Sequence, residues 1–478
     1  MKPTCPFLRV MLITLMATSV LAAETTEKKA REGLARERST NVLGLFTKLL
    51  ASGVFVVGRE AEEYARNDLE LPLPGVPKWN EMQWEIDRDA GRLTVRYEDY
   101  PPRTAVYNGD QGCTLLPVGE TQVHFTPVPV KSTLPPPDTL PWPMGDQVPD
   151  TPPAGVDMPT IQAALDLAFD ETKQKVPQHT RAMVVVHGGQ LVGEWYAPGY
   201  TRDTRHISWS MGKSITAALV GILVQNGHFN LHDPAPVPEW QRPDDPRRAI
   251  TIAHLMNMSS GLDFKMGLIG SMFTSKDHHK AVYFGAVNVF DYSVNRQPEF
   301  PPNTVCRYRN CDPLILGSII RDTVEKNGEE YLTFPQRALF DKIGARNFVL
   351  ECDPWGNFIM TGFDYGTARD WARFGMLHLQ DGGWNGERIL PEGWVDFVRT
   401  PAPASENKDY GGLFWLNRGG NFSSLPEDAY WPAGHHSQTV LIIPSHDLVI
   451  VRLGHSSRGG FDAYFEPIVK MIIEALAT

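Results

Sequence analysis

The chain has 478 residues, of which 42% are hydrophobic and 21% are charged, as is ordinary for a globular protein. A chain of this length can bury a sizeable core, which excludes disorder over most of its length. The formal net charge of −11 argues against non-specific binding to nucleic acid, and the sequence has no basic stripe.

The first 22 residues have the pattern of an export signal. Lys2 and Arg9 give a basic start before the apolar stretch VMLITLMATSVLA, small residues follow it, and cleavage is expected after Ala22 or Ala23. A membrane anchor is the alternative, but the stretch has about 13 residues whereas a membrane span needs about 20. We therefore expect a signal peptide over residues 1–22. The protein would be bacterial and periplasmic or secreted, with no stable membrane span after signal removal.

Residues 23–126 are predicted to form an N-terminal α+β extension. The segment NVLGLFTKLLASGVFVVG (41–58) contains Lys48 and ends in charge, which favours a helix and a strand of the mature protein. The segment WEIDRDAGRLTVRYEDY alternates polar and apolar residues on both sides of a glycine turn, as two strands do. The proline density of residues 127–159 excludes regular helix and sheet, so this segment is either a linker or an extended strap over the surface.

Residues 160–478 have the pattern of one large α+β domain. A helix is expected in TIQAALDLAFDETKQ, two strands in MVVVHGGQLVGEWY, and helical segments with polar loops after them. A hairpin turning at residues 444–447 is expected in TVLIIPSHDLVIVRLG, and a last helix in YFEPIVKMIIEALA. Strands at both ends with helices between them predict one antiparallel sheet, built from distant segments and backed by the two terminal helices.

The stretch HISWSMGKSITAALVGILVQNG (206–227) combines a serine, a lysine three residues later and a helix apolar enough to be buried. If the helix begins at Ser210, the side chains of Ser210 and Lys213 lie on one face, one turn apart. A serine hydroxyl needs a base to become a good nucleophile, and a lysine can be that base when burial lowers its pKa. The Ser210 N–H, at the positive helix end, can also face a developing oxyanion. An ordinary helix start is the alternative interpretation.

Two further segments favour the catalytic interpretation. CRYRNCDPLILGSII contains Tyr308 and Asn310 just before an apolar run. A tyrosine hydroxyl near a lysine can exchange protons with a leaving group, and an asparagine amide can hold the lysine and the substrate. A core tyrosine with a capping asparagine is the alternative. YWPAGHHSQTVLIIP is a glycine turn that enters a strand, whose edge can supply a second oxyanion N–H and a backbone ladder for the substrate.

The combination and order of these segments resemble the serine β-lactamase and penicillin-binding-protein superfamily over about residues 160–478. The similarity is greatest to its class C-like branch of esterases, D-amino-acid peptidases and 6-aminohexanoate-dimer hydrolases. It extends to HLMNMSSGLDF (254–264), GFDYGTARDWARFGMLHLQDGGWNGERILPEGW (362–394) and YGGLFWLN (410–417). The resemblance implies a helical lobe and an α/β lobe with a five-stranded antiparallel sheet, with the active site between them.

The resemblance also implies roles for the residues that match the motifs. Ser210 would be the nucleophile, acylated first and freed by water afterwards. Lys213 would be the general base and Tyr308 the proton-shuttling partner. The remaining matches are Asn310 in the third place of Tyr-x-Asn, Gly434 as the glycine of the third motif, and His435, whose N–H would be the second oxyanion donor.

The third motif departs from the family pattern, which is usually Lys-Thr-Gly or His-Thr-Gly. With Gly434 as the motif glycine, Pro432 occupies the lysine position. A shifted register would instead place His435 there and Ser437 in the glycine position. The family lysine normally helps to hold a substrate carboxylate, so its absence favours an esterase or amidase acting on less anionic substrates.

The sequence thus predicts an exported serine hydrolase that cleaves a small-molecule ester or amide through an acyl-enzyme intermediate, with no cofactor, metal or nucleic acid. One alternative is β-lactamase or D,D-peptidase activity. An alternative of another class is a catalytically silent envelope binding or scaffold protein. In an exported protein Cys113, Cys306, Cys311 and Cys352 could form up to two disulfides, with three possible connectivities.

Overall fold

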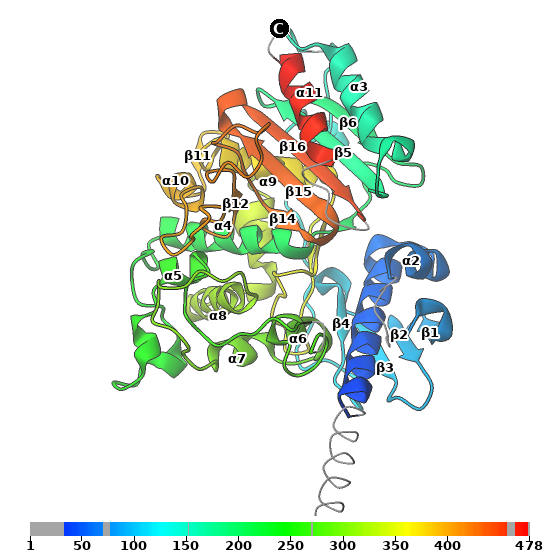
Figure 1. Ribbon diagram of the computed structural model, residues 1–478, viewed down its shortest axis with the longest axis vertical. Coiled ribbons are helices and arrows are strands. Elements are labelled where there is room, and N and C mark those ends of the chain that lie inside the picture. Colours follow the sequence, from blue (N-terminus) through cyan, green and yellow to red (C-terminus); the bar gives the residue numbers. More distant parts are fainter. Residues whose placement is uncertain (1–32, 70–76, 152, 269–270, 457–463, 477–478) are drawn as a thin grey trace, which may run out of the picture.

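A computed structural model of the chain describes residues 33–69, 77–151, 153–268, 271–456 and 464–476. The expected signal peptide, residues 1–22, lies outside the described residues. Figure 1 shows a sheet with helices on both faces, a helical lobe next to it, and the N-terminal part of the chain beside that lobe. The α+β fold class expected from the sequence is confirmed.

The main sheet is antiparallel and takes its strands from both ends of the region after residue 160. The strands follow the order β12-β13-β15-β16-β5-β6, and β14 also pairs with β15. Both hairpins predicted in this region are confirmed. The strands are β5 (Thr180–His187), β6 (Gln190–Tyr196), β12 (Trp415–Leu416), β13 (Tyr430–Trp431), β14 (Ala433–Gly434), β15 (Gln438–Ile443) and β16 (Leu448–Gly454).

Pro432 divides the strand beside β15 into β13 and β14. Proline lacks the N–H that a ladder needs, so it interrupts pairing where it occurs. Tyr430 still pairs with Ile442, and Gly434 pairs with Gln438. The five strand positions that the resemblance implies are therefore β6, β5, β16, β15 and this divided strand, and β12 adds a short strand beyond them.

Helices cover both faces of the main sheet. Helices α3 (Met158–Phe169) and α11 (Glu466–Leu476) pack on one face, and α9 (Ala368–Leu379) packs on the other. Successive side chains of a strand point to opposite faces. Accordingly Met183 and Val185 join the core under α3 and α11, whereas Val184 and Val186 join the larger core on the other side.

Helix α4 (Gly212–Gln225) runs through the centre of the molecule, at the boundary of the sheet and the helical lobe (Figure 1). Its residues 212–223 are all buried, as expected of a helix that is apolar on every side. The rest of the helical lobe and two small sheets comprise α5 (Ile252–Met256), α6 (His278–Phe284), α7 (Val289–Val294), α8 (Cys311–Lys326), α10 (Trp394–Val398), β7 (His206–Ile207), β8 (Val349–Leu350), β9 (Asp364–Gly366), β10 (Gly383–Trp384) and β11 (Glu387–Arg388).

The N-terminal part begins with a long helix, Gly33–Val57, followed by α2 (Ala61–Asp68) and a four-stranded antiparallel sheet. The sheet has the order β1-β2-β3-β4, and its strands are β1 (Gln83–Asp87), β2 (Arg92–Arg96), β3 (Arg103–Tyr107) and β4 (Cys113–Leu115). The two strands predicted in WEIDRDAGRLTVRYEDY (84–100) are confirmed as β1 and β2.

The strand predicted near residue 58 is wrong, because the helix continues to Val57 and ends at Gly58 in a left-handed conformation. The β-branched run there favours a strand locally, but Val54 and Val56 are buried in the larger core, and tertiary packing overrides local propensity. By length and mean hydropathy, 1.6, this helix could also cross a membrane, yet 78% of its most apolar window is buried inside the protein. Core helices of soluble proteins pass the same test.

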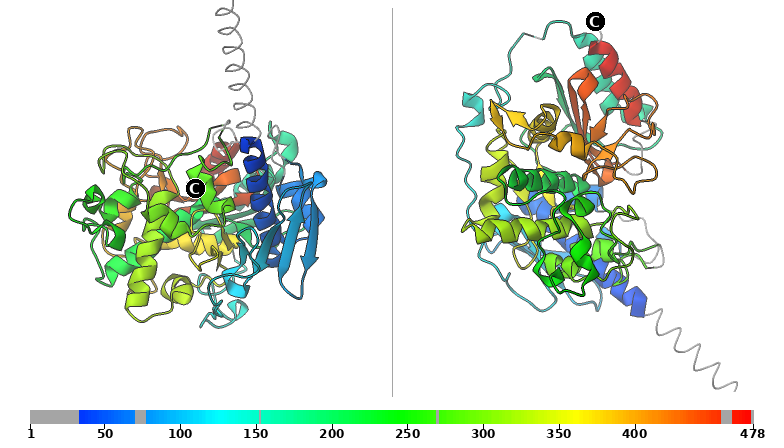
Figure 2. Two further views of the ribbon diagram at one scale, coloured as in Figure 1. Left: turned by 90° about the horizontal axis from the view of Figure 1, so that it is seen from below. Right: turned by 90° about the vertical axis from the view of Figure 1, so that its left-hand side faces the viewer.

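Residues 127–151 and 153–157 run along the outside of the molecule, between the N-terminal part and α3, which begins at Met158 (Figure 2, right). Hydrogen bonds between side chains and backbone carbonyls hold this strap against the larger region. Arg373 donates to the carbonyls of Pro143 (2.7 Å) and Gly145 (2.8 Å), and the Trp142 indole donates to the Gly189 carbonyl (3.1 Å).

The four cysteines of the described residues are free thiols, so the disulfides considered from the sequence are absent among them. Cys306 and Cys311, which flank the tyrosine motif, lie in different surroundings. The Sγ of Cys306 contacts the Asn257 carbonyl at 3.5 Å, and that of Cys311 contacts the Ser293 carbonyl at 3.8 Å. Burial raises the pKa of the Cys306 thiol to about 11.

Candidate active site

Ser210 lies in a tight turn, Trp209–Met211, between β7 and the start of α4. The preceding residue, Trp209, has a φ of 47°, in the left-handed region that costs a non-glycine residue about 1–2 kcal/mol. Backbone strain of this kind gathers at functional sites, where the surrounding structure holds it in place. The turn leaves the Ser210 side chain partly exposed at the wall of a cavity.

Lys213 is one turn along from Ser210, and its Nζ lies 3.1 Å from the Ser210 Oγ. The side chain is 1% exposed, and the Nζ also donates to the Thr361 carbonyl at 3.2 Å. Burial lowers the pKa of Lys213 to about 7, while the Asp364 carboxylate opposes the shift. An amine with this pKa is about half neutral at pH 7, and the neutral form can accept the serine proton.

Asp364 lies directly beneath the turn and is fully buried. Its side chain accepts a hydrogen bond from the Ser208 hydroxyl (3.0 Å), and its backbone carbonyl accepts one from the Ser208 N–H (2.7 Å). A Cβ on Gly212 would be 1.7 Å from the Asp364 Oδ2, so only glycine fits there. Burial raises the pKa of Asp364 well above its usual value. Sequence reasoning assigned it no role, although it stands in the segment GFDYG.

Tyr308 comes from the loop before α8 and lies beside both residues. The Lys213 Nζ is 4.8 Å from the centroid of its ring. The ring packs against Trp415 at 5.4 Å and edge-on against Tyr410 at 5.6 Å. Burial raises the pKa of Tyr308, and its contact with Ser210 opposes the rise. Ser210 and Lys213, predicted from one segment, and Tyr308, predicted from another, are thus brought together.

Asn310, two residues on, is fully buried at the start of α8. Its side-chain amide donates to the His279 carbonyl at 2.6 Å, and its Oδ1 has no hydrogen-bond partner among the described residues. The amide therefore holds the start of α6 in place. The hydrogen bond to Lys213 that the sequence suggested is not formed, while contact with a substrate stays a prediction.

Gly434 lies at the end of β14, against the turn that carries Ser210. A Cβ at this position would be 2.0 Å from the Ser208 carbonyl oxygen, so the strand can approach only with glycine here. This contact favours Gly434, rather than Ser437, as the motif glycine. His435 follows in a tight turn, and its ring packs edge-on against the Trp209 ring at 5.7 Å.

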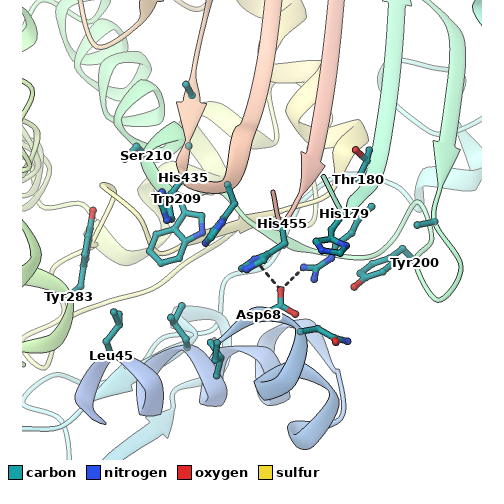
Figure 3. A pocket seen from close by; sticks show the side chains of 18 of the residues that line it. Leu45, Asp68, His179, Thr180, Tyr200, Trp209, Ser210, Tyr283, His435 and His455 are labelled. Carbon is teal, nitrogen blue, oxygen red and sulfur yellow. Dashed lines mark hydrogen bonds and ion pairs between the residues drawn. The ribbon is translucent and has the colours of Figure 1, made fainter. Parts of the chain in front are cut away.

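A cavity of about 1210 Å³ opens in front of Ser210 and has four kinds of lining (Figure 3). The end at Ser210 presents Trp209, Ser210, Tyr283, Tyr308 and Trp415, and the sheet edge presents Gly434 and His435. The helix Gly33–Val57 presents Leu45, Phe46 and Leu49, and the far end presents Asp68, Arg181 and His455.

Sequence reasoning missed two parts of this lining. The Tyr283 hydroxyl donates to the Thr361 carbonyl at 2.5 Å, the same carbonyl that holds Lys213. Tyr283 stands in no recognisable motif, so nothing in the sequence pointed to it. The N-terminal helix was expected outside the domain that carries the site, and its contribution depends on contacts between distant segments.

Comparison with known proteins gives the family of the chain and proteins that are similar to it. The family described as Beta-lactamase matches residues 170–469 of this chain. The 6-aminohexanoate-dimer hydrolase of Paenarthrobacter ureafaciens is 23% identical over 315 residues, which cover 61% of this chain and 76% of that protein.

Two solved structures share the fold. A family VIII carboxylesterase has a TM-score of 0.52 at 15% identity and covers 69% of this chain and 99% of that one. A penicillin-binding-protein homologue from Caulobacter crescentus has a TM-score of 0.51 at 14% identity, with the same two coverages. Because the family match spans more than half of the sequence, this chain belongs to the Beta-lactamase family.

Proposed function

We propose that this protein is a serine hydrolase that cleaves an ester or an amide through an acyl-enzyme on Ser210. The observation that carries the proposal is the buried Lys213 amine, 3.1 Å from the Ser210 Oγ and with a pKa lowered to about 7. A serine with a neutral amine at hydrogen-bond distance has the geometry of an activated nucleophile.

In the proposed reaction the Ser210 Oγ attacks the substrate carbonyl carbon as its proton passes to Lys213. The N–H groups of Ser210 and His435 would stabilise the oxyanion of the tetrahedral intermediate. The Tyr308 phenol would give its proton to the leaving group, which departs as an alcohol or amine, and would take the proton held by Lys213 in its place. Water then attacks the acyl-enzyme by the same proton route in reverse and releases a carboxylic acid and free Ser210.

The proposed substrate class follows from the lysine that the third motif lacks. Pro432 stands where the family usually has a lysine, so this strand offers no cation for a substrate carboxylate. An ester or amide without that carboxylate suits the site better than a penicillin or a peptide C-terminus. The names of the similar proteins, a 6-aminohexanoate-dimer hydrolase and a carboxylesterase, support the same two classes.

A fluorophosphonate probe tests the nucleophile. We expect wild-type protein to be labelled and Ser210→Ala to remain unlabelled. The two proteins are then compared on short p-nitrophenyl esters, p-nitroanilides and nitrocefin, and we expect ester or anilide turnover to exceed nitrocefin turnover. A well-folded wild type that takes no label would contradict the proposal and favour a binding or scaffold protein. Nitrocefin as the best substrate would favour a β-lactamase.

We also propose that the protein is exported, on the pattern of residues 1–22. The test is N-terminal sequencing of the protein recovered from the cell envelope and medium of an expressing bacterium. A new N-terminus at Ala23 or Glu24 is expected, and full-length protein confined to the cytoplasm would contradict export.

A further inference from the structure

We propose that the N-terminal helix Gly33–Val57 forms one wall of an acyl-binding site, so that the preferred substrates carry an apolar acyl chain longer than acetyl. This inference rests on the proposed function of Ser210. It assigns to the N-terminal part of the chain a direct role in choosing the substrate.

The wall is built from one face of the helix. Leu45 and Leu49 are one turn apart on that face, and Phe46 stands next to Leu45. All three line the cavity that contains Ser210, and their side chains are only 7%, 8% and 4% exposed. Figure 3 shows Leu45 on this helix facing Trp209 and Tyr283 across the cavity. Apolar groups on both sides of the space in front of a nucleophile favour a hydrocarbon chain there.

The helix is fixed to the rest of the protein at several points. The Asn41 side chain donates to the Phe273 carbonyl at 2.9 Å, and Phe273 also lines the cavity. The Ser52 hydroxyl donates to the Glu351 carboxylate at 2.9 Å, which anchors the far end of the helix. A wall held in this way is preorganised, so a substrate need not order it on binding.

The α2 end of the N-terminal part is anchored as well. Asp68 lies at the far end of the cavity, is 5% exposed, and pairs with Arg181 of β5. It also pairs with Arg59 at 2.6 Å and lies 3.5 Å from the His455 ring (Figure 3). The charged end of the cavity is thus largely occupied by its own ion pairs. Leu69, Phe169 and Trp195 line the cavity as well, so its apolar lining is not confined to the wall beside Ser210.

Burying one methylene contributes about 0.8 kcal/mol, which is about a fourfold gain in kcat/KM for each methylene that the wall covers. A series of p-nitrophenyl esters from acetate to decanoate measures this gain directly. In wild-type protein kcat/KM should rise with acyl length until the chain reaches the end of the apolar lining.

Leu45→Trp fills the space at the wall, and we expect it to lower the ratio of kcat/KM for octanoate to that for acetate by at least tenfold. Phe55→Trp is the matched control, because Phe55 is on the same helix but its ring stacks on Tyr107 outside the cavity. The control should leave the ratio within twofold of wild type. Circular dichroism melting checks the fold of both variants, and Leu49→Phe replaces Leu45→Trp if the latter does not fold.

A wild type that turns over no ester and takes no fluorophosphonate label refutes the proposed function itself. A wild type that hydrolyses acetate with no gain for longer acyl chains refutes only the acyl-binding site. An unchanged ratio of kcat/KM for octanoate to that for acetate in folded Leu45→Trp or Leu49→Phe also refutes the acyl-binding site. A parallel series of acetate esters with longer alcohols separates the two sides of the scissile bond. A gain confined to the alcohol side overturns the assignment to the acyl chain.

Discussion

Lys48 and Glu351 form an ion pair across 303 residues of sequence, and neither side chain is more than 1% exposed. The Glu351 carboxylate also accepts hydrogen bonds from the Cys113 N–H (2.7 Å) and the Ser52 hydroxyl. Gly112 has a φ of 61°, and a Cβ there would be 2.6 Å from the Glu351 Cγ. This buried pair therefore joins the N-terminal helix and β4 to the region that carries the active site.

The first prediction concerns the stability that depends on this pair. Removing one partner of a buried pair leaves an uncompensated charge, which costs about 3–5 kcal/mol. Lys48→Met should lower the free energy of unfolding by that amount, measured by urea denaturation. The double variant Lys48→Met with Glu351→Leu should lose less, since neither charge remains.

The exposed pair Lys342–Glu387, 44% and 56% exposed, supplies the control. Lys342→Met should change the free energy of unfolding by about 0–1 kcal/mol, as is usual for surface pairs. Equal losses for Lys48→Met and Lys342→Met would show that the buried pair does not anchor the helix.

The second prediction concerns the pH dependence of turnover. Lys213 can accept the serine proton only when it is neutral, and burial lowers its pKa to about 7. In the free enzyme kcat/KM should therefore rise with pH up to about 7 and level off above it. Lys213→Arg, whose guanidinium stays protonated, should be inactive across the range. A wild-type rate that is constant down to pH 5 would remove Lys213 as the base.

The third prediction is that the burial of Lys213 lowers the free energy of unfolding. Its pKa is about 7 in the folded protein against 10.5 ordinarily, so the unfolded chain binds the proton more tightly. The cost is absent above pH 10.5, grows as the pH falls towards 7, and is constant below that value. Lys213→Met should raise the free energy of unfolding at pH 6 by about 1–3 kcal/mol, with a smaller gain at pH 9. Urea denaturation at both pH values measures the difference, and a loss of stability at pH 6 would refute it.

Local patterns were sufficient for the parts of the site that lie within short segments. Ser210 and Lys213 are three residues apart on a helix, so their proximity is fixed by helical geometry alone. The hairpins of the main sheet follow from alternating and apolar runs around turn residues. The sequence could not indicate that β13 and β14 both pair with β15 on either side of Pro432.

The rest of the site depends on contacts between distant segments. Asp364 lies under Gly212 because β9 pairs with β7, and Leu45 reaches the cavity because Lys48, on the same helix, is tied to Glu351. Neither contact produces a periodic pattern of residues that could be recognised in the sequence. The strand wrongly predicted near residue 58 has the same origin, since the buried environment of Val56 outweighs its β-branched side chain.

The last prediction separates the role of Tyr308 from its packing. If the phenol protonates the leaving group, Tyr308→Phe should lower kcat on an anilide by about 10²–10⁴-fold. The loss on a p-nitrophenyl ester of the same acid should be much smaller, because p-nitrophenolate departs without a proton. Tyr410→Phe is the matched control, since Tyr410 is buried and packs edge-on against Tyr308 at 5.6 Å. It should leave both rates within a few-fold of wild type. Equal losses on anilide and ester in Tyr308→Phe would assign the tyrosine to positioning Lys213 rather than to proton transfer.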